Sequence, residues 1–423
     1  MRRNGSSGAP TTALLLVSAL LLLLTPSANG ETKFRTLYKF KGGSDASGPQ
    51  AGLVFDSAGN LYGTTIYGGA QKSGTVFKLT RHSHGKWTES VLYSFCSLLH
   101  CTDGSAPTAS LVFDSSGNLY GTTTGGGANY ANEYAGTIFE LTAGSDGKWT
   151  ESVLYSFCAL QNCADGSLPQ AALVFDNNGT LYGTTRLGGA SNRGTAFQLA
   201  PQQGGGWTEG VIYSFCSGCG NGEIPTAPLI FDAIGNLYGT TFYPDGTTYG
   251  TVFELSPGSG GTWSESVLYS FPNPTDTGGE PWAGLAFDQA GDLYGTAWGA
   301  GKPGCNSYGC GGVFQLTPNG TGGWDETTLY LFTGGVDGST PLAGVTLDSS
   351  GNVYGTTAGG GAQTGVVYKL AYESGGWNYR ILHTFGADGD PQAGLILDGA
   401  GSLYGTTFGN QNVNHGSVFK LTP

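Results

Sequence analysis

The sequence predicts an all-β fold, a seven-bladed β-propeller of four-stranded blades, and three observations lead to it. A Leu-Tyr-Gly-Thr core, with Val once in place of Leu, recurs seven times at intervals of 50 to 62 residues. Each core lies among four short runs of β-forming residues separated by glycine-rich turns. The two ends of the chain each carry part of one repeat. The tyrosines of the core are Tyr62, Tyr120, Tyr182, Tyr238, Tyr294, Tyr354 and Tyr404.

The first repeat shows how one blade is expected to form. Residues 51–56 are an apolar run, which we call strand A, and residues 61–65 are rich in β-forming residues and make strand B. Residues 74–79 alternate apolar and polar as strand C, and residues 87–95 make strand D. No segment after residue 30 shows helical periodicity with capping residues, so each repeat is expected to contain strands only.

The two ends of the chain are expected to close the ring. Residues 34–40 match strand D, whereas the last repeat stops after strand C at residues 416–421. Joining them would complete a seventh sheet and remove the open edges that invite aggregation. A linear β-solenoid is the alternative, but it needs capping units at both ends and none is visible. We expect one domain over residues 31–423, with blade strands at 51–95, 109–157, 171–215, 227–271, 283–332, 343–385, and 393–422 together with 34–40.

Residues 1–30 are expected to be a signal peptide outside the fold. Arg2 and Arg3 precede an apolar run from Ala13 to Leu24 and a small-residue exit, which is the layout of a secretory signal. A retained N-terminal anchor is the alternative, although the run is short for a bilayer span. No second apolar stretch of that length follows. We therefore expect a secreted protein, extracellular or periplasmic, with no membrane insertion after cleavage.

The charge balance argues against one class of partner. The chain has 17 Lys and Arg against 30 Asp and Glu, which gives a formal net charge of −13 at pH 7. Binding to nucleic acid rests on neutralising phosphates with basic side chains. We therefore expect no nucleic-acid partner. The excess of negative charge favours solubility and a mild attraction for cations.

The eight cysteines fall in four local pairs, and an even number in a secreted chain indicates disulfides. Each pair would close a small loop, so it would restrain that loop rather than the whole fold. A zinc site at Cys216 and Cys219 is the alternative, although no second close pair of cysteines or histidines stands beside it. The expected pairs are Cys96 with Cys101, Cys158 with Cys163, Cys216 with Cys219, and Cys305 with Cys310.

The connections at the two ends of the blades differ in how much they vary between repeats. The A–B turns are short and nearly uniform, as at residues 56–60 and 114–118, and are typical of turns in which Asp and Asn bond their own backbone. The D–A and B–C connections are long and variable, and all four cysteine pairs fall there. We call these two sides of the ring the turn face and the loop face, and we expect function on the loop face.

Aromatic side chains recur among the glycines and asparagines of the loop face. Such side chains suit stacking on sugar rings, because they offer an apolar surface at a low entropic cost. The alternative is that several of them pack against a neighbouring blade. Arg186 and Phe242 lie in the same loops. The candidate ligand-binding residues are Tyr67, Tyr134, Tyr243, Trp282, Trp298 and Phe408.

An aspartate also recurs in the D–A loops, shortly before a proline. A partial ring of carboxylates at the channel mouth could hold a hard cation such as Ca²⁺. The alternative, favoured because the feature recurs in most blades, is a turn aspartate that accepts bonds from backbone N–H groups. The candidate metal ligands are Asp103, Asp165, Asp337 and Asp388.

The recurring phrase at residues 52–56, 59–65 and 74–79 resembles the GloVer tandem repeat, and the resemblance covers essentially all of residues 34–423. It points to the choice-of-anchor tandem repeat GloVer-containing proteins and implies a secreted bacterial surface protein with no assigned activity. Members often carry a C-terminal sorting anchor, whereas this chain ends at Pro423 without an apolar tail, so free secretion is expected. A weaker similarity to NHL-type and lactonase-type propeller repeats brings no catalytic residues with it.

The sequence offers little catalytic chemistry. It contains no G-x-S-x-G elbow and no phosphate-binding loop, while paired carboxylates brought together only by the fold stay open. The leading hypothesis is a non-catalytic binding or scaffold propeller that recognises a glycan or a protein through the loop face. The alternative is an extracellular enzyme, a lyase, lactonase or glycosidase, with carboxylates or a divalent metal at the channel mouth.

Overall fold

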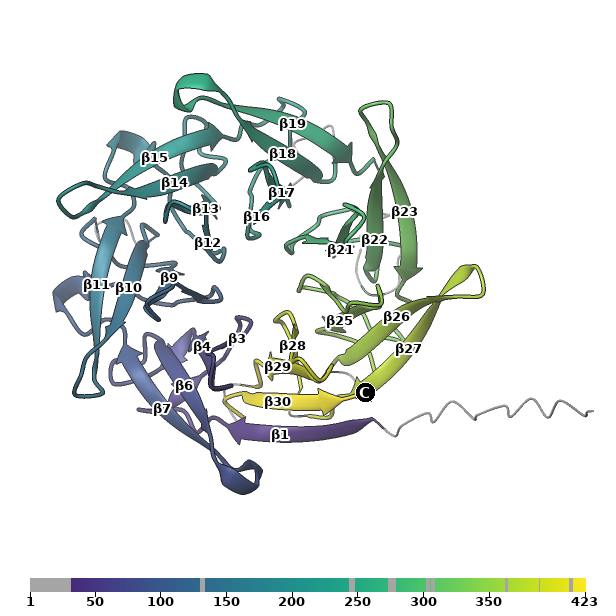
Figure 1. The fold of residues 1–423 in the computed structure, drawn as a ribbon, viewed down its shortest axis with the longest axis horizontal. Coiled ribbons are helices and arrows are strands. Elements are labelled where there is room, and N and C mark those ends of the chain that lie inside the picture. Colours follow the sequence, from purple (N-terminus) through teal and green to yellow (C-terminus); the bar gives the residue numbers. More distant parts are fainter. Residues whose placement is uncertain are drawn as a thin grey trace, which may run out of the picture. The chain divides into compact units, whose positions relative to one another are not determined.

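The structure, a computed structural model, describes residues 32–129, 134–242, 248–272, 279–301, 305, 309–361, 364–387, 389–410 and 414–423. Within these residues the strands form seven four-stranded antiparallel sheets, which stand in a ring around a central channel (Figure 1). This is the seven-bladed propeller that the repeats predict. The signal peptide expected at residues 1–30 lies outside the described residues.

Each blade places its strands in the order A, B, C, D from the channel outward, and we number the blades in sequence order. The A strands are β3 (Val54–Phe55), β8 (Val112–Phe113), β12 (Val174–Phe175), β16 (Ile230–Phe231), β20 (Ala286–Phe287), β24 (Thr346–Leu347) and β28 (Ile396–Leu397). The B strands are β4 (Leu61–Thr65), β9 (Leu119–Thr123), β13 (Leu181–Thr185), β17 (Leu237–Thr241), β21 (Leu293–Ala297), β25 (Val353–Thr357) and β29 (Leu403–Thr407). The C strands are β6 (Thr75–Arg81), β10 (Thr137–Ala143), β14 (Thr195–Pro201), β18 (Thr251–Pro257), β22 (Gly312–Pro318), β26 (Val366–Glu373) and β30 (Ser417–Thr422). The D strands are β7 (Trp87–Ser94), β11 (Trp149–Ser156), β15 (Trp207–Ser214), β19 (Trp263–Ser270), β23 (Trp324–Leu331), β27 (Gly376–Thr384) and β1 (Lys33–Lys39).

A few short elements lie outside the blades. Strands β2 (Ala46–Ser47) and β5 (Tyr67–Gly68) pair with each other on the loop face. Short 3₁₀ turns are η1 (Ser83–Gly85), η2 (Leu99–Cys101), η3 (Gln161–Cys163) and η4 (Ser259–Gly261). No helix in the described part of the chain has the length and apolar character needed to cross a membrane.

The N-terminal strand closes the ring. Strand β1 pairs antiparallel with β30, with Lys33 opposite Thr422 and Lys39 opposite Ser417. Figure 1 shows this pair as the purple strand beside the yellow one. The prediction that residues 34–40 complete the last blade is therefore confirmed, and the linear solenoid is excluded. Closure leaves each blade with a neighbour on both sides.

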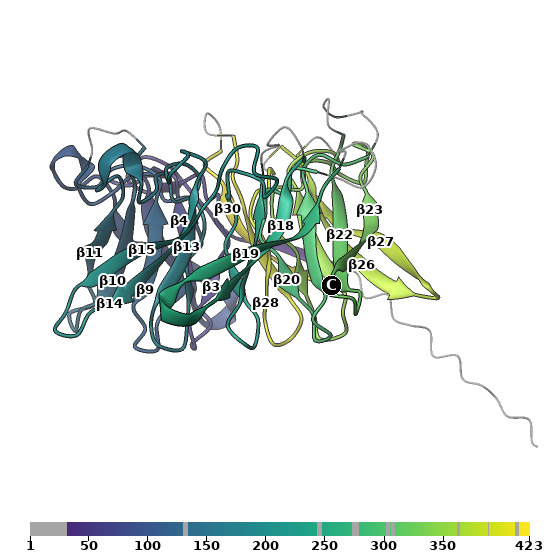
Figure 2. The same cartoon turned by 90° about the horizontal axis from the view of Figure 1, so that it is seen from above.

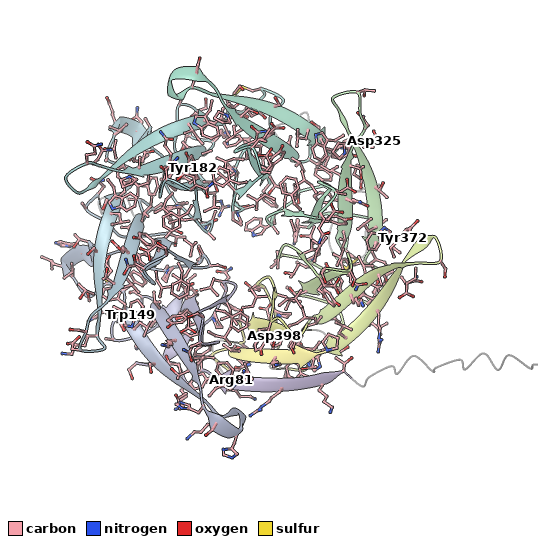
Figure 3. The ribbon with its side chains drawn as sticks, in the orientation of Figure 1. Arg81, Trp149, Tyr182, Asp325, Tyr372 and Asp398 are labelled. Atoms are coloured by element: carbon pink, nitrogen blue, oxygen red, sulfur yellow. A yellow bond between two sulfur atoms is a disulfide. The ribbon has the colours of Figure 1, made fainter. Side chains whose placement is uncertain are left out.

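The hydrophobic core lies between neighbouring blades. Tyr182 of blade three, for example, contacts the rings of Phe231 and Trp263 of blade four, with 5.4 and 5.8 Å between ring centroids (Figure 3). Seven clusters of this kind occur among the described residues, one at each junction between blades. Burying one such aromatic side chain contributes about 2–3 kcal/mol. Each blade therefore completes its core only with its neighbours.

The Leu-Tyr-Gly-Thr core is explained by this packing. A Cβ atom on Gly121 would lie 2.6 Å from Cζ of Phe139 and 3.0 Å from Cδ2 of Leu111, so only glycine leaves room for the ring of the C-strand phenylalanine. Tyr120 directs its hydroxyl to Oδ2 of Asp114, which it reaches at 3.3 Å. The glycine and the tyrosine of the core therefore each have a structural role.

The threonine of the core joins each blade to the next. Thr122 Oγ1 donates to the carbonyl oxygen of Ala171 at 3.2 Å, and the same bond joins all seven pairs of neighbouring blades. The bond from Thr406 to the carbonyl of Ala51, also 3.2 Å, spans the closure of the ring. Both partners are buried, so removing the hydroxyl would leave an unsatisfied carbonyl.

The two faces of the ring match the expectation from sequence. The A–B and C–D turns lie on one side, and the longer D–A and B–C loops lie on the other (Figure 2). Asp56 accepts bonds from the backbone N–H groups of Ala58 and Asn60, at 3.0 and 2.8 Å, so its turn is held by its own aspartate. All four predicted disulfides are present on the loop face, which excludes the zinc alternative at Cys216 and Cys219.

Candidate functional site: the channel mouth on the loop face

The loop-face end of the channel is a concave site shared by all seven blades. A cavity of about 400 Å³ opens there, at the start of the A strands. One residue directly follows a proline in every D–A loop, and all seven such residues line the cavity. We call these positions the rim: Gln50, Thr108, Gln170, Thr226, Trp282, Leu342 and Gln392.

Below the rim the channel wall carries a ring of small residues, one from each blade. Two positions after each rim residue, glycine, alanine, serine or proline faces the cavity. A Cβ on Gly344 would lie 2.6 Å from the carbonyl oxygen of Gly284 in the neighbouring blade, so the inner strands approach closely. The rim residues therefore supply most of the chemical variety that a ligand would meet at this end of the channel.

Backbone bonds hold the rim rigidly. The residue before each proline has a φ between 53° and 71°, as at Ile224 with a φ of 62°. Its N–H donates to the carbonyl of Arg193 in blade three at 2.9 Å, and its own carbonyl accepts from the N–H of Phe242 in blade four at 3.1 Å. Every D–A loop is clamped in this way between the B–C loops of two blades. A positive φ at β-branched Ile224 is unusual and persists because the surrounding bonds impose it.

One side of the mouth carries an aromatic cluster with a cation. Phe242 lies edge-on to Trp282, with 4.5 Å between ring centroids, and 6.3 Å from the ring of Trp298. The guanidinium carbon of Arg186 lies 5.9 Å from the ring centroid of Trp282. Arg186, Phe242 and Trp298 each directly follow a B strand, in blades three, four and five. We call these four residues the aromatic sector.

Another part of the mouth, between blades seven and one, is a chain of amide groups. Gln50 Nε2 donates to Oε1 of Gln392 at 3.1 Å, and Gln392 Nε2 donates to Oδ2 of Asp390 at 2.8 Å. Burial raises the pKa of Asp390, and the bond from Gln392 offsets part of that rise. The rings of Tyr67 and Phe408 lie 6.4 Å apart nearby on the same two blades. We call these five residues the amide sector.

Two buried glutamates occupy the D–A loops on either side of blade four. Glu223 is 2% exposed and pairs with Nε of Arg193 at 2.6 Å, so its charge is compensated. Glu280 is 4% exposed, and among the described residues its Oε2 has no hydrogen-bond partner. Burial raises the pKa of Glu280 to about 7. Glu280 can therefore hold or release a proton near neutral pH.

The structure brings four of the sequence candidates into two groups. Trp282 and Trp298 meet through Phe242 in the aromatic sector. Tyr67 and Phe408 meet in the amide sector, where Tyr67 is 45% exposed. Trp282 is the only one of the four that lines the cavity itself, so it is the strongest candidate for direct contact with a ligand.

The remaining aromatic candidates are Tyr134 and Tyr243. Tyr134 of blade two is 61% exposed, and no ring contact joins it to either sector within the part of the chain that the structure describes. Tyr243 lies outside the described residues, as does the proposed metal ligand Asp388. The ligand-binding role of Tyr134 and Tyr243 stays a prediction.

The aspartates predicted as metal ligands act in their own loops. Asp103 accepts bonds from the hydroxyl of Tyr93 and the N–H of Ser97, both at 2.8 Å, and Asp165 and Asp337 repeat the arrangement. In the described segments no group of three or more His, Cys, Asp or Glu side chains is placed to hold a metal. These bonds support the turn interpretation, and the Ca²⁺ site stays a prediction.

Sequence reasoning missed Glu280, Gln50 and Gln392. The signal for them was present, because they flank a proline that recurs in all seven D–A loops. A comparison of the residues on either side of that proline across the seven repeats would have identified the rim. Gln50 and Gln392 belong to the first and last repeats, and their hydrogen bond to each other requires the closed ring.

Comparison with known proteins supports the repeat and the fold. The family model of the Gloeobacter/Verrucomicrobia repeat matches residues 22–248 and 225–423, and no curated protein matches the chain. The extracellular domain of BT4673 from B. thetaiotaomicron is similar, with a TM-score of 0.55 and 12% identity over 92% of this chain and 41% of that one. A protein of unknown function from Dyadobacter fermentans DSM 18053 has a TM-score of 0.48 and 9% identity, covering 93% of this chain and 98% of that one.

Proposed function

This chain belongs to the Gloeobacter/Verrucomicrobia repeat family, and we propose that its propeller is a secreted protein that binds a glycan at the channel mouth of the loop face. The observation that carries the proposal is the aromatic sector. Trp282 lines the cavity, and Phe242 packs edge-on against its ring. Glutamine and threonine occupy five of the seven rim positions, so hydrogen-bonding groups surround the aromatic surface.

This combination suits a sugar more than a flat protein surface. A pyranose ring has an apolar face that stacks on an indole and a circumference of hydroxyl groups that bond amides and hydroxyls. The cavity is concave, as small-ligand sites are. The clamped D–A loops hold the rim before a ligand arrives, which lowers the entropic cost of binding.

Secretion is proposed from two observations. Four disulfides are typical of proteins outside the cytosol, where thiols are not kept reduced. Residues 1–30 have the layout of a signal peptide. The disulfides lie on the loop face, so they would keep its loops in shape in an extracellular setting.

The test is a glycan-array screen of the protein lacking residues 1–30, run with calcium and again with EDTA. We expect binding to a defined sugar, and Trp282→Ala should weaken it about 30-fold, as for a buried aromatic hot spot. Leu342→Ala, at the same rim position in blade six, is the matched control and should retain binding. Equal binding by the Trp282→Ala variant would contradict the assignment. Loss of binding in EDTA would support the Ca²⁺ site.

A second candidate, an extracellular glycan-cleaving enzyme, is favoured by Glu280. The carboxyl is buried with its pKa raised to about 7, which suits a general acid or base. The backbone carbonyl oxygen of Glu280 accepts a hydrogen bond from the N–H of Trp298 at 3.2 Å, so Glu280 adjoins the aromatic sector. Prolonged incubation with bound glycans should then release fragments, and Glu280→Gln should stop the release while retaining binding. If the glycans were recovered intact, the cleaving function would be contradicted and only the binding function would remain.

A further inference from the structure

Arg186 is the one charged side chain among the seven residues that directly follow a B strand. Its backbone is fixed, because its N–H donates to the carbonyl of Leu168 at 3.0 Å. The other blades place neutral side chains at this position: Ile66, Thr124, Phe242, Trp298, Ala358 and Phe408. The mouth therefore departs from its sevenfold pattern by one cation, in blade three.

The Arg186 side chain extends from blade three to the beginning of blade five. Its guanidinium carbon lies 5.9 Å from the ring centroid of Trp282. The rim position of the intervening blade is Thr226, a small side chain that is 8% exposed. Thr226 Oγ1 donates to the carbonyl oxygen of Trp282 at 3.0 Å, which holds the backbone of the tryptophan in place. The cation and the indole are therefore neighbours on a fixed frame.

The charge of Arg186 is not compensated in the way that the charge of Arg193 is. Arg193, seven residues later in the same loop, pairs with the buried Glu223 at 2.6 Å. In the described residues no carboxylate forms an ion pair with Arg186, although the whole chain has a formal net charge of −13. A half-buried guanidinium that lies beside an aromatic cluster, and that has no ion pair among the described residues, favours an anionic group on the ligand.

We propose that the aromatic sector takes an acidic sugar, with the carboxylate of a uronic acid on Arg186 and the sugar ring on Trp282. The inference rests on the proposed glycan-binding function and names its ligand class. A guanidinium that lies beside an aromatic ring still has N–H groups along its own edge that can donate hydrogen bonds. Two of these N–H groups have the spacing of the two oxygens of a carboxylate. In a uronic acid the carboxylate is attached directly to the pyranose ring, which fits two protein groups about 6 Å apart.

The experiment measures binding of matched acidic and neutral ligands by calorimetry. The probes are oligogalacturonate, alginate oligosaccharides and hyaluronan oligosaccharides, each beside its methyl ester, which keeps the sugar and removes the charge. At least one acid should bind about tenfold more tightly than its ester, because a charge-assisted pair is lost on esterification. The preference should shrink as salt is raised from low to physiological concentration.

Variants of Arg186 separate the charge from the fold. Arg186→Gln should lower the affinity for the acid to about that of its ester, so that the preference is lost, and Arg186→Lys, which keeps a positive charge but only a single ammonium donor group, should keep part of the preference. Melting temperatures of the variants near that of the wild-type protein exclude unfolding as the cause.

The outcomes distinguish the two proposals. Esters that bind as tightly as acids, with binding still dependent on Trp282, would overturn the acidic-sugar inference and leave glycan binding intact. A sulfated galactan oligosaccharide that binds while all three uronates do not would also overturn it, in favour of a different anion. No binding of any probe, acidic or neutral, together with an empty glycan array, would overturn both proposals.

Discussion

The turn face and the loop face are built from the same seven repeats but use them in opposite ways. On the turn face, the aspartate of every A–B turn accepts the same two backbone N–H bonds, from Asp56 in blade one to Asp398 in blade seven. On the loop face the backbone bonds also repeat, whereas the rim side chains range from Leu342 to Trp282. Identical backbone bonding is what allows side chains to vary at the mouth without loss of the ring.

The carboxyl groups of the turn face and those of the D strands differ in the direction of their pKa shifts. Burial raises the pKa of Asp348 on the turn face, but bonds from Asn352 and Tyr354 outweigh it and lower the pKa overall. On the D strands, burial raises the pKa of Glu151 to about 7, and the nearby Asp103 adds to the rise. Glu89, Glu209 and Glu265 are shifted in the same direction, to about 8, 7 and 7.

The largest expected effect is a loss of stability on raising the pH, because several glutamates act together. A glutamate whose folded pKa lies above its ordinary value of 4.5 contributes stability that is complete below pH 4.5 and is lost as the pH rises through about 7 to 8. Asp56, Asp348 and Asp398, with lowered pKa values, contribute stability that is lost as the pH falls below 3.8. The melting temperature at fixed ionic strength should therefore be highest near pH 5 and decline toward pH 9.

A quadruple glutamine variant, E89Q/E151Q/E209Q/E265Q, is the control for that pH profile. An amide does not ionise, so the decline between pH 5 and pH 9 should flatten, while the acid limb set by the turn aspartates stays. If the wild-type protein melted at a higher temperature at pH 8 than at pH 5, the raised pKa values assigned to these four half-buried glutamates would be wrong.

Within blade four, the turn face should determine stability. Asp232 accepts the N–H groups of Ile234 and Asn236, both at 2.9 Å, and the hydroxyl of Tyr238 at 3.2 Å. Asp232→Ala removes these three hydrogen bonds and should cost about 3 kcal/mol of unfolding free energy. Denaturant unfolding measures the loss, and Asp232→Asn, which keeps an acceptor oxygen, should lose less. The ligand affinity of the folded variant should be unchanged. A loss of affinity in Asp232→Ala would contradict the conclusion that the turn face affects stability and not binding.

The loop face of the same blade should determine binding. Phe242 supports the rings of Trp282 and Trp298, so Phe242→Ala should weaken glycan affinity about tenfold, with a smaller effect on stability than Asp232→Ala. Phe242→Leu, which retains apolar bulk, should recover part of the affinity. Titration calorimetry and thermal melts of both variants provide the comparison. Unchanged affinity in Phe242→Ala would remove the aromatic sector from the binding site.

The smallest expected effect is a gain in ligand affinity from a substitution at the rim of blade six. Leu342 occupies the position that Trp282 occupies in blade five, so Leu342→Trp would add a second indole to the same cavity. A single exposed stacking contact should tighten binding of a longer oligosaccharide by no more than about threefold, with no change in melting temperature. Titration of oligosaccharides of increasing length into the wild-type protein and the Leu342→Trp variant measures this change in affinity. A sharp loss of affinity would show that the cavity is already filled by ligand at that side.

The fold was predictable from sequence because each repeat carries its own structural residues. Gly121 must leave room for Phe139, and Asp56 must hold its own turn, so such local requirements recur in every copy and are visible as a pattern. The closing strand at residues 34–40 was predictable for the same reason, since it is a D strand displaced to the other end of the chain.

The candidate site was predictable only in part, because its residues depart from the repeat. Trp282 and Trp298 were singled out as aromatics in loops, yet their connection through Phe242 depends on side-chain directions in two neighbouring blades. Glu280 is marked in the sequence by its place before the recurring proline, but its raised pKa arises from burial that only the assembled loops provide. Position within the repeat identifies the rim, whereas the ring decides which rim residues meet.

The closing pair of strands has a consequence for how the chain is made. Among the strands of the ring, β1 is synthesised first and its partner β30 is synthesised last. Strand β1 therefore stays unpaired while the strands between them are translated. At roughly 5–20 residues per second that interval lasts on the order of tens of seconds. Lys33, Arg35 and Lys39 are all exposed along β1, and such positive charges on an unpaired strand discourage wrong pairing. The same three residues would thus protect the nascent chain until its final strand arrives.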